Sequence, residues 1–118
     1  MKIRNQELFQ LHADYCKMLA NPKRLMILTL LSMEEMSVGE IANSIDTALA
    51  TVSQHLTVLR NRHIVVARKE GQTVYYSVTD PRLMDASILI RSVLLDGMKR
   101  RGEIARQIEV DPVGVVVG

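Results

Sequence analysis

The sequence has a single cysteine, Cys16, and few aromatic residues: no tryptophan, one phenylalanine and three tyrosines. One cysteine cannot form a disulfide within the chain, which is typical of a reducing compartment, so we expect a cytoplasmic protein. Scarce aromatics argue against binding of single-stranded nucleic acid, which uses aromatic side chains as stacking platforms. The sequence also has no apolar run of membrane-spanning length and no charged-then-apolar leader. We therefore expect no membrane association and no signal peptide.

Signatures of catalysis are missing too. There is no glycine-rich phosphate loop, no arrangement of Ser, His and Asp with the context of a triad, and no cluster of metal-ligand residue types. We therefore expect that the protein is not an enzyme, and we predict no cofactor. The formal net charge of +2 is too small to identify a partner. With 118 residues, 47% of them hydrophobic, the chain suffices for one domain with an aliphatic core.

Apolar residues recur at helical spacing along most of the chain. This spacing predicts helices over about 6–20, 22–33, 38–45, 49–61 and 81–101. Asn21-Pro22 and Asp80-Pro81 are each an N-cap followed by a favoured first helical residue, and Ser37 with Glu40 forms a capping-box pattern. The period changes over residues 64–79, where β-branched residues and tyrosines flank Glu70-Gly71-Gln72, which predicts a β-hairpin. The predicted fold is mainly α with a small β-hairpin.

The helix over 49–61 combines a buried stripe with an uncharged polar face. Val52, Leu56 and Leu59 are spaced to face the core. Stepping 100° per residue from Val52 places Gln54 near the most exposed direction and His55 only about 60° from the buried centre. We therefore expect Gln54 to contact a base, and His55 to be a half-buried packing residue rather than a base reader. The candidate DNA-binding residues are Thr51, Ser53, Gln54, His55, Thr57, Arg60, Arg62, Arg68, Lys69 and Gln72.

Two short helices joined by a turn and followed by a hairpin predict a winged helix-turn-helix. Residues 47–79 hold four cations, Arg60, Arg62, Arg68 and Lys69, against Glu70 alone, which leaves a local balance of four minus one, or +3. Such a balance favours phosphate contact. The helix over 81–101 is too apolar for one small domain to cover, so we expect a two-fold dimer.

In this order, the elements resemble the ArsR/SmtB family of winged-helix repressors. The resemblance rests on Ala20–Leu31, Val38–Ala42, Thr51–Arg60 and Gly71–Tyr76. It implies a homodimer that binds an imperfect palindrome in double-stranded DNA and blocks transcription until an effector weakens the DNA-bound form. We expect residues 1–102 to form the winged helix-turn-helix domain with dimerisation helices at about 6–20 and 81–101. Residues 103–118 form a tail of uncertain structure.

The sequence departs from the family pattern at several positions. His63 stands where glycine is frequent, so we expect a left-handed backbone there, and Thr47 is expected to cap the next helix in place of a serine near Ala48. The family's metal sites are not matched, because the third helix has Ser37 and Gly39 where cysteines are needed and the last helix has no histidine. The effector is therefore unknown.

Four further side chains carry weaker expectations. Cys16 is expected to be a small buried hydrophobe, and with His12 one helical turn away it is a weak metal-site candidate. Arg24 is expected to have a structural role, paired with an acid. Of Tyr75 and Tyr76, one is expected to face the core. Two alternatives stay open: another winged family such as MarR, and a winged module that binds protein without DNA.

Overall fold

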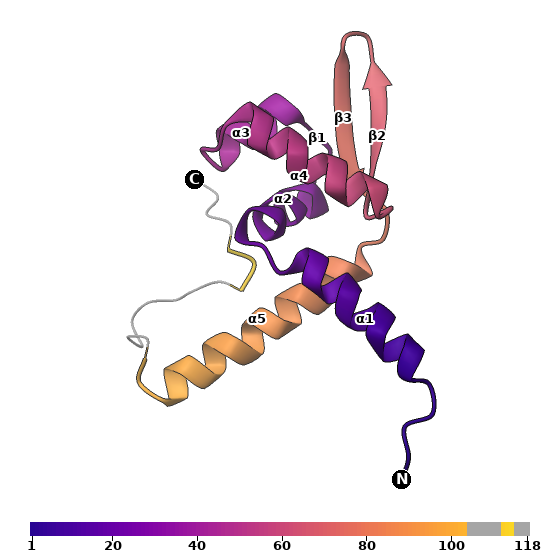
Figure 1. Ribbon diagram of the computed structural model, residues 1–118. Coiled ribbons are helices and arrows are strands. Elements are labelled where there is room, and N and C mark those ends of the chain that lie inside the picture. The colour runs from indigo at the N-terminus through magenta and orange to yellow at the C-terminus, as the bar shows by residue number, and fades with distance from the viewer. Residues whose placement is uncertain (104–111, 115–118) are drawn as a thin grey trace.

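The computed structural model describes residues 1–103 and 112–114 (Figure 1). Within these residues, five helices and three strands follow one another along the chain. They are α1 (Gln6–Leu19), α2 (Pro22–Met33), β1 (Met36–Ser37), α3 (Val38–Ser44), α4 (Leu49–Asn61), β2 (Val65–Glu70), β3 (Thr73–Val78) and α5 (Arg82–Arg100). Every predicted helix is confirmed to within one residue at each end. The tail expected over 103–118 lies mostly outside the described residues.

The core forms where α2, α3 and α4 meet. The predicted stripe of α4 is confirmed, because Val52, Leu56 and Leu59 are 0%, 1% and 0% exposed. Ile27 of α2 and Ile41 of α3 are equally buried against them. Each such side chain contributes about 1.5–3 kcal/mol of burial free energy. The polar face of α4 is therefore held in place by a stripe of almost completely buried side chains on the opposite side of the same helix.

Side chains cap most of the helices. Asn21 Oδ1 accepts from the backbone N–H of Arg24 at 3.1 Å, and Ser37 and Glu40 form both bonds of the predicted capping box. Asp80 Oδ1 accepts from the backbone N–H of Arg82, whose guanidinium also pairs with that carboxylate. These bonds to Arg82 lower the pKa of Asp80 to about 2. The first turn of α5 is therefore tied to the residue before Pro81.

The expected cap of α4 by Thr47 is wrong. The helix begins after Ala48 without a side-chain cap. The hydroxyl of Thr47 is committed elsewhere, because it donates to the carbonyl of Ile45 and accepts from Lys23 Nζ at 2.8 Å. Thr47 therefore fastens the turn between α3 and α4 to the start of α2.

The hairpin belongs to a three-stranded antiparallel sheet in the order β1-β3-β2. The sequence pattern did not predict β1, in which Met36 lies opposite Tyr76 and Ser37 opposite Tyr75. Tyr76 packs against the core, whereas Tyr75 lies below the guanidinium of Arg68, 5.2 Å from its ring centroid. Since Ser37 is also the N-cap of α3, the sheet and the first short helix share a residue.

The junction between α4 and β2 has the predicted left-handed residue. His63 has a φ of 60°, a conformation that His tolerates better than most residues other than glycine. Its backbone N–H donates to Arg60, and its carbonyl accepts from the hydroxyl of Thr79. Helix α4 therefore ends in a fixed turn that leads directly into the hairpin.

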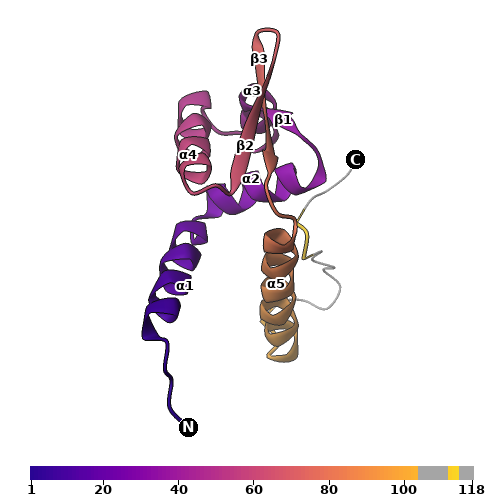
Figure 2. The ribbon, with the colours of Figure 1, turned by 90° about the vertical axis from the view of Figure 1, so that its right-hand side faces the viewer.

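Helices α1 and α5 extend away from this body on the side opposite the tip of the hairpin (Figure 2). Each helix leaves a broad apolar face exposed in the single chain. The exposed residues are Leu8, Phe9, Leu11 and Tyr15 on α1, and Leu89, Ile90, Val93 and Leu94 on α5, at 39–70% exposure. None of the helices in the described ranges has both the length and the apolarity needed to cross a bilayer.

Candidate nucleic-acid interface

The helix-turn-helix comprises α3, the four-residue turn 45–48 and α4. Asp46 takes a left-handed φ of 50° in that turn, and the backbone N–H of Thr47 donates to the carbonyl of Ala42. Figure 1 shows α4 lying beside the hairpin, whose tip projects beyond the helices. The second helix and the hairpin therefore form one contiguous end of the molecule.

The outward face of α4 has the character that the helical wheel predicts. Ser53, Gln54 and Thr57 are exposed, while Thr51 is half-buried rather than fully outward. The hydroxyl of Thr57 donates to the carbonyl of Ser53, which leaves its oxygen lone pairs to accept. The amide of Gln54 makes no hydrogen bond to any described residue, and both its donor and its acceptor are free to pair with the two groups that adenine presents in the major groove.

His55 is half-buried, as the wheel predicts, and its ring is fixed by Arg24. Arg24 Nε donates to His55 Nδ1 at 3.2 Å, and its Nη1 donates to the carbonyl of Met18 at 2.8 Å. Partial burial, then the charges of Arg24 and Lys23, lower the pKa of His55. The expected structural role of Arg24 is confirmed, but its expected acidic partner is wrong: the acceptors are a neutral imidazole and a backbone carbonyl.

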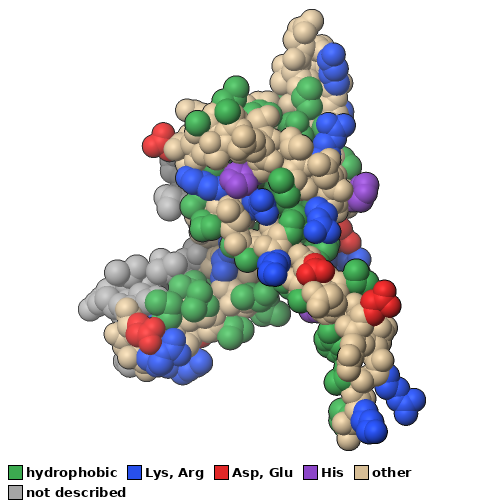
Figure 3. All heavy atoms as spheres, in the orientation of Figure 1, with side chains coloured by type: hydrophobic (Ala, Val, Ile, Leu, Met, Phe, Trp, Pro, Cys, Tyr) green, Lys and Arg blue, Asp and Glu red, His purple; other side chains and the backbone are tan. Residues whose placement is uncertain are grey.

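Cations lie at the end of α4 and on the hairpin, on the face that Figure 3 presents. Arg60, Arg62 and Lys69 are exposed, and these three side chains have no hydrogen-bond or ion-pair partner in the described part of the chain. Gln72 is exposed at the hairpin tip, next to Gly71 with its left-handed φ of 60°. These groups can reach toward an anionic surface without giving up an internal bond.

Arg68 differs from the other cations because two carboxylates hold it. Its Nε donates to Glu35 Oε2 at 3.1 Å, and its Nη1 donates to Glu70 Oε2 at 2.8 Å. These bonds raise the pKa of Arg68, and the bond from Arg68 lowers the pKa of Glu35. Glu35 lies outside residues 47–79, the segment for which the sequence gives a local charge of +3. The charge that the hairpin offers to a phosphate is therefore smaller than the sequence count suggests.

Leu49 is a further candidate contact that the sequence pattern did not predict. It is the first residue of α4 and is 58% exposed. In helix-turn-helix proteins, the N-terminal residues of the second helix approach the base edges, and an apolar side chain there suits a thymine methyl. The signal was a large apolar residue outside the buried stripe, at the N-terminus of the predicted helix.

Cys16 is exposed in the single chain, so the expectation that the single chain buries it is wrong. The reason is that α1 stands off the core, with Met18 as its buried residue. His12, one turn earlier, is also exposed. Within residues 1–103 and 112–114, no three His, Cys, Asp or Glu side chains form a group that could hold a metal ion.

Comparisons with known proteins agree with this geometry. The model of the bacterial regulatory protein arsR family matches residues 21–66. The nodulation protein NolR of Rhizobium meliloti is 39% identical over 87 residues, which cover 74% of this chain and 68% of NolR. The crystal structure of Rv0081 from Mycobacterium tuberculosis superimposes with a TM-score of 0.72 at 36% identity, covering 80% of this chain and 95% of that one.

A third similar structure is the homodimeric winged helix-turn-helix DNA-binding domain Mb0332 of Mycobacterium bovis, with a TM-score of 0.70. It is 31% identical and covers 85% of this chain and 93% of that one. These matches favour the ArsR reading over a MarR-like one. The chain belongs to the arsR family of bacterial regulatory proteins, and it is a DNA-binding transcriptional regulator with the winged helix-turn-helix fold.

Proposed function

We propose that this chain acts as a homodimeric repressor that binds an imperfect palindrome in double-stranded DNA. The observation that carries the proposal is the exposed, uncharged polar face of α4, flanked by cations without a partner among the described residues: Arg60 and Arg62 at the end of the helix and Lys69 on the hairpin. Groups that match base edges suit sequence readout, and flanking cations suit phosphates. The protein is then a regulator rather than an enzyme, acting in the cytoplasm where its DNA lies.

In this proposal α4 is the reading helix, the one that enters the major groove. Gln54 is assigned the central base contact, with Ser53 and Thr57 beside it and Thr51 at the edge of the face. Arg60, Arg62, Lys69 and Gln72 are assigned to phosphates and sugars. Arg68 can join them when a phosphate displaces Glu35 or Glu70 from its guanidinium. His55 supports the reading helix from its half-buried position and contacts DNA only at its free edge.

The apolar faces of α1 and α5 support the dimer. Eight large apolar side chains on these helices are at least 39% exposed in the single chain, far more than a monomer of this size normally leaves in contiguous patches. Burying them in a two-fold interface would pair two reading helices, which matches an operator with two half-sites. Residues 1–102 would form this unit, and an effector would release it from DNA.

Substitution of Gln54 tests the assignment of the reading face. Gln54→Ala should lower the preference for the selected operator over random duplex by about 1–3 kcal/mol, because a bidentate base contact is lost. The operator is obtained by selection from random duplexes with the wild-type protein. Binding of both duplexes is then measured by fluorescence anisotropy at fixed salt.

Gln6→Ala is the matched control, since Gln6 is an exposed glutamine on α1, far along the chain from the reading helix. It should leave the preference unchanged. If Gln54→Ala weakens binding to operator and random duplex equally, Gln54 does not read a base, and the assigned orientation of α4 is wrong.

A further inference from the structure

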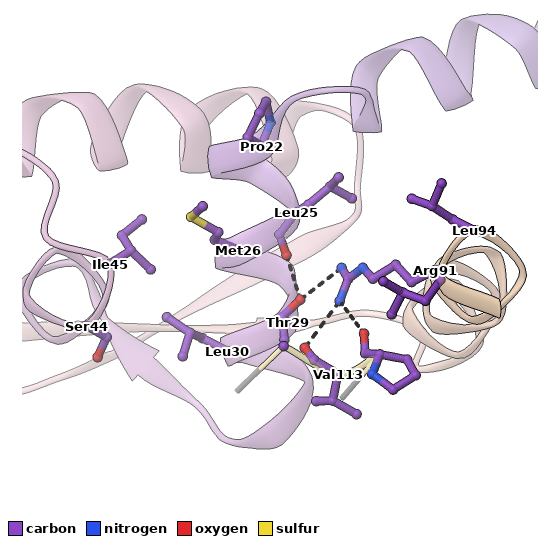
Figure 4. A pocket seen from close by; sticks show the side chains of 13 residues that line it. Pro22, Leu25, Met26, Thr29, Leu30, Ser44, Ile45, Arg91, Leu94 and Val113 are labelled. Atoms are coloured by element: carbon purple, nitrogen blue, oxygen red, sulfur yellow. Dashed lines mark hydrogen bonds between the residues drawn. The ribbon is translucent and has the colours of Figure 1, made fainter. Parts of the chain in front are cut away.

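A hollow of about 810 Å³ lies between the helix-turn-helix and α5 (Figure 4). Its walls come from α2, from the end of α3, from the middle of α5, and from the short stretch 112–114. Leu25, Met26, Leu30, Ile45 and Leu94 make most of its surface apolar. A hollow of this size and character, with a few converging polar groups, is typical of a site for a small organic ligand.

The polar group at the centre of this hollow is the guanidinium of Arg91. Its Nη2 donates to Thr29 Oγ1 at 3.1 Å, and its Nη1 donates to the backbone carbonyls of Pro112 and Val113 at 3.2 and 3.3 Å. Thr29 is 5% exposed, and its hydroxyl donates to the carbonyl of Leu25, so its oxygen is fixed toward Arg91. Every hydrogen-bond acceptor that the described residues give Arg91 is therefore uncharged.

We propose that this hollow binds a small amphipathic carboxylate, whose charged end pairs with Arg91 and whose apolar body lies among Leu25, Met26, Leu30 and Ile45. Arginine binds a carboxylate through two parallel N–H groups, and such charge-assisted bonds are roughly twice as strong as bonds to neutral acceptors. A carboxylate entering from the open side would replace the two long carbonyl contacts to residues 112 and 113 while the bond to Thr29 persists.

The chemistry of the walls narrows the class of ligand. A purely apolar ligand would leave the guanidinium without a new partner, and an inorganic anion would leave the apolar wall uncovered. A ligand with one carboxylate and an unbranched or aromatic body satisfies both parts of the hollow. The volume of about 810 Å³ has room for a body of the length of a medium-chain fatty acid.

The position of the site also gives the ligand a regulatory consequence, which rests on the proposed function. The hollow joins Ile45, at the end of the first helix of the helix-turn-helix, to Leu94 and Arg91 on α5. A bound molecule would hold these two parts at a different separation. In a dimer built on α5, that separation sets the distance between the two reading helices, so ligand and DNA binding are coupled.

The test uses octanoate and octanamide, two probes that differ mainly in charge, with the full chain. Isothermal titration calorimetry without DNA should show saturable binding of octanoate and at least tenfold weaker binding of octanamide. Arg91→Gln should remove the difference between the two probes, and Arg91→Lys should restore part of it. Arg100→Gln, the same change at an exposed position on the same helix, should leave the difference intact.

A second variant tests the site independently, in case Arg91→Gln fails to fold. Met26→Trp enlarges a side chain that is 44% exposed and lines the hollow, so it should block octanoate with little effect on stability. Circular dichroism melts of all variants check folding. Equal binding of both probes, no saturable binding, or octanoate binding that survives both Arg91→Gln and Met26→Trp would overturn the site.

A third measurement separates this proposal from the proposed function. Operator binding is measured by anisotropy with and without octanoate. If octanoate binds but the protein does not bind DNA, the proposed function fails and the site stands. If both bind and octanoate leaves DNA affinity unchanged, the regulatory consequence is wrong.

Discussion

At the scale of single residues, the bond between Arg24 and His55 has a chemical consequence for the reading helix. The N–H of Arg24 needs a lone pair on His55 Nδ1, so the ring must be neutral with its hydrogen on Nε2. A protonated ring carries hydrogens on both nitrogens and cannot accept. The contact between the start of α2 and the middle of α4 therefore depends on the protonation state of one imidazole.

This dependence predicts how stability varies with pH. The pKa of His55 lies below its usual value because of partial burial and the nearby charges of Arg24 and Lys23. The unfolded chain therefore binds the proton more readily, and stability, complete above about pH 6.5, falls as the pH drops toward the folded pKa. The urea midpoint of the wild type should decrease between pH 7 and pH 5 by more than that of His55→Asn, which keeps an acceptor but does not titrate.

The matched control is His12→Asn, which removes an exposed histidine of α1. Its urea midpoint should follow pH as the wild-type midpoint does. Parallel pH profiles for the wild type and His55→Asn would show that the proton on His55 is not linked to folding.

At the scale of the elements, the hairpin is less cationic than its own sequence suggests. Glu35 reaches Arg68 across 33 positions of sequence and holds it together with Glu70. Exposed ion pairs of this kind add little to stability, typically below about 1 kcal/mol. Their larger effect is on the surface, where the two carboxylates offset the charge that Arg68 would present to a phosphate.

Substitutions around the hairpin distinguish the contributions of Arg68 and Lys69 to DNA binding. Lys69→Ala should weaken binding to all duplexes and reduce the slope of log affinity against log salt by about one, because one phosphate contact is lost. Glu35→Gln should have the opposite effect, raising affinity and steepening the slope, because one negative charge is removed and Arg68 keeps only Glu70 as an acidic partner. Both slopes are measured by anisotropy titrations over a range of salt concentrations.

Glu34→Gln is the control for Glu35→Gln, since it neutralises the neighbouring exposed carboxylate, for which the described residues provide no side-chain partner. Its salt slope should shift less than that of Glu35→Gln. A slope unchanged in both Lys69→Ala and Glu35→Gln would mean that the hairpin lies away from the phosphates.

The elements themselves could be predicted from sequence because their signals are local. Periodic apolar residues and caps such as Asn21 and Ser37 lie within one or two turns of the helix that they define. β1 has two residues, too few to show alternation, and the pairing of Arg68 with Glu35 depends on the sheet that β1 completes. The predicted burial of Cys16 and the predicted capping role of Thr47 were wrong for the same reason, because each depends on contacts between residues far apart in sequence. Cys16 is exposed because α1 stands off the core, and Thr47 is bonded to Lys23 of α2.

At the scale of the whole molecule, the exposed faces of α1 and α5 predict a dimer. Light scattering at micromolar concentration should give twice the chain mass of 13.3 kDa. Ile90→Asp places a charge at a position of α5 that is 70% exposed in the single chain, and it should shift the mass toward that of the monomer.

Val66→Asp is the matched control, because Val66 is an apolar residue of the hairpin that is 50% exposed. It should remain dimeric. A monomer mass for the wild type, or an unchanged mass for Ile90→Asp, would contradict the assignment of α5 to the interface.

The two-residue strand β1 has a mechanical consequence for such a dimer. Backbone hydrogen bonds join Met36 and Ser37 to the hairpin, and Ser37 begins α3, so the hairpin and the helix-turn-helix cannot turn independently. In each subunit the helix-turn-helix and the hairpin therefore contact DNA as one rigid unit. Any adjustment to the spacing of two half-sites must come from the connections of this unit to α1 and α5, near Ala20 and Asp80.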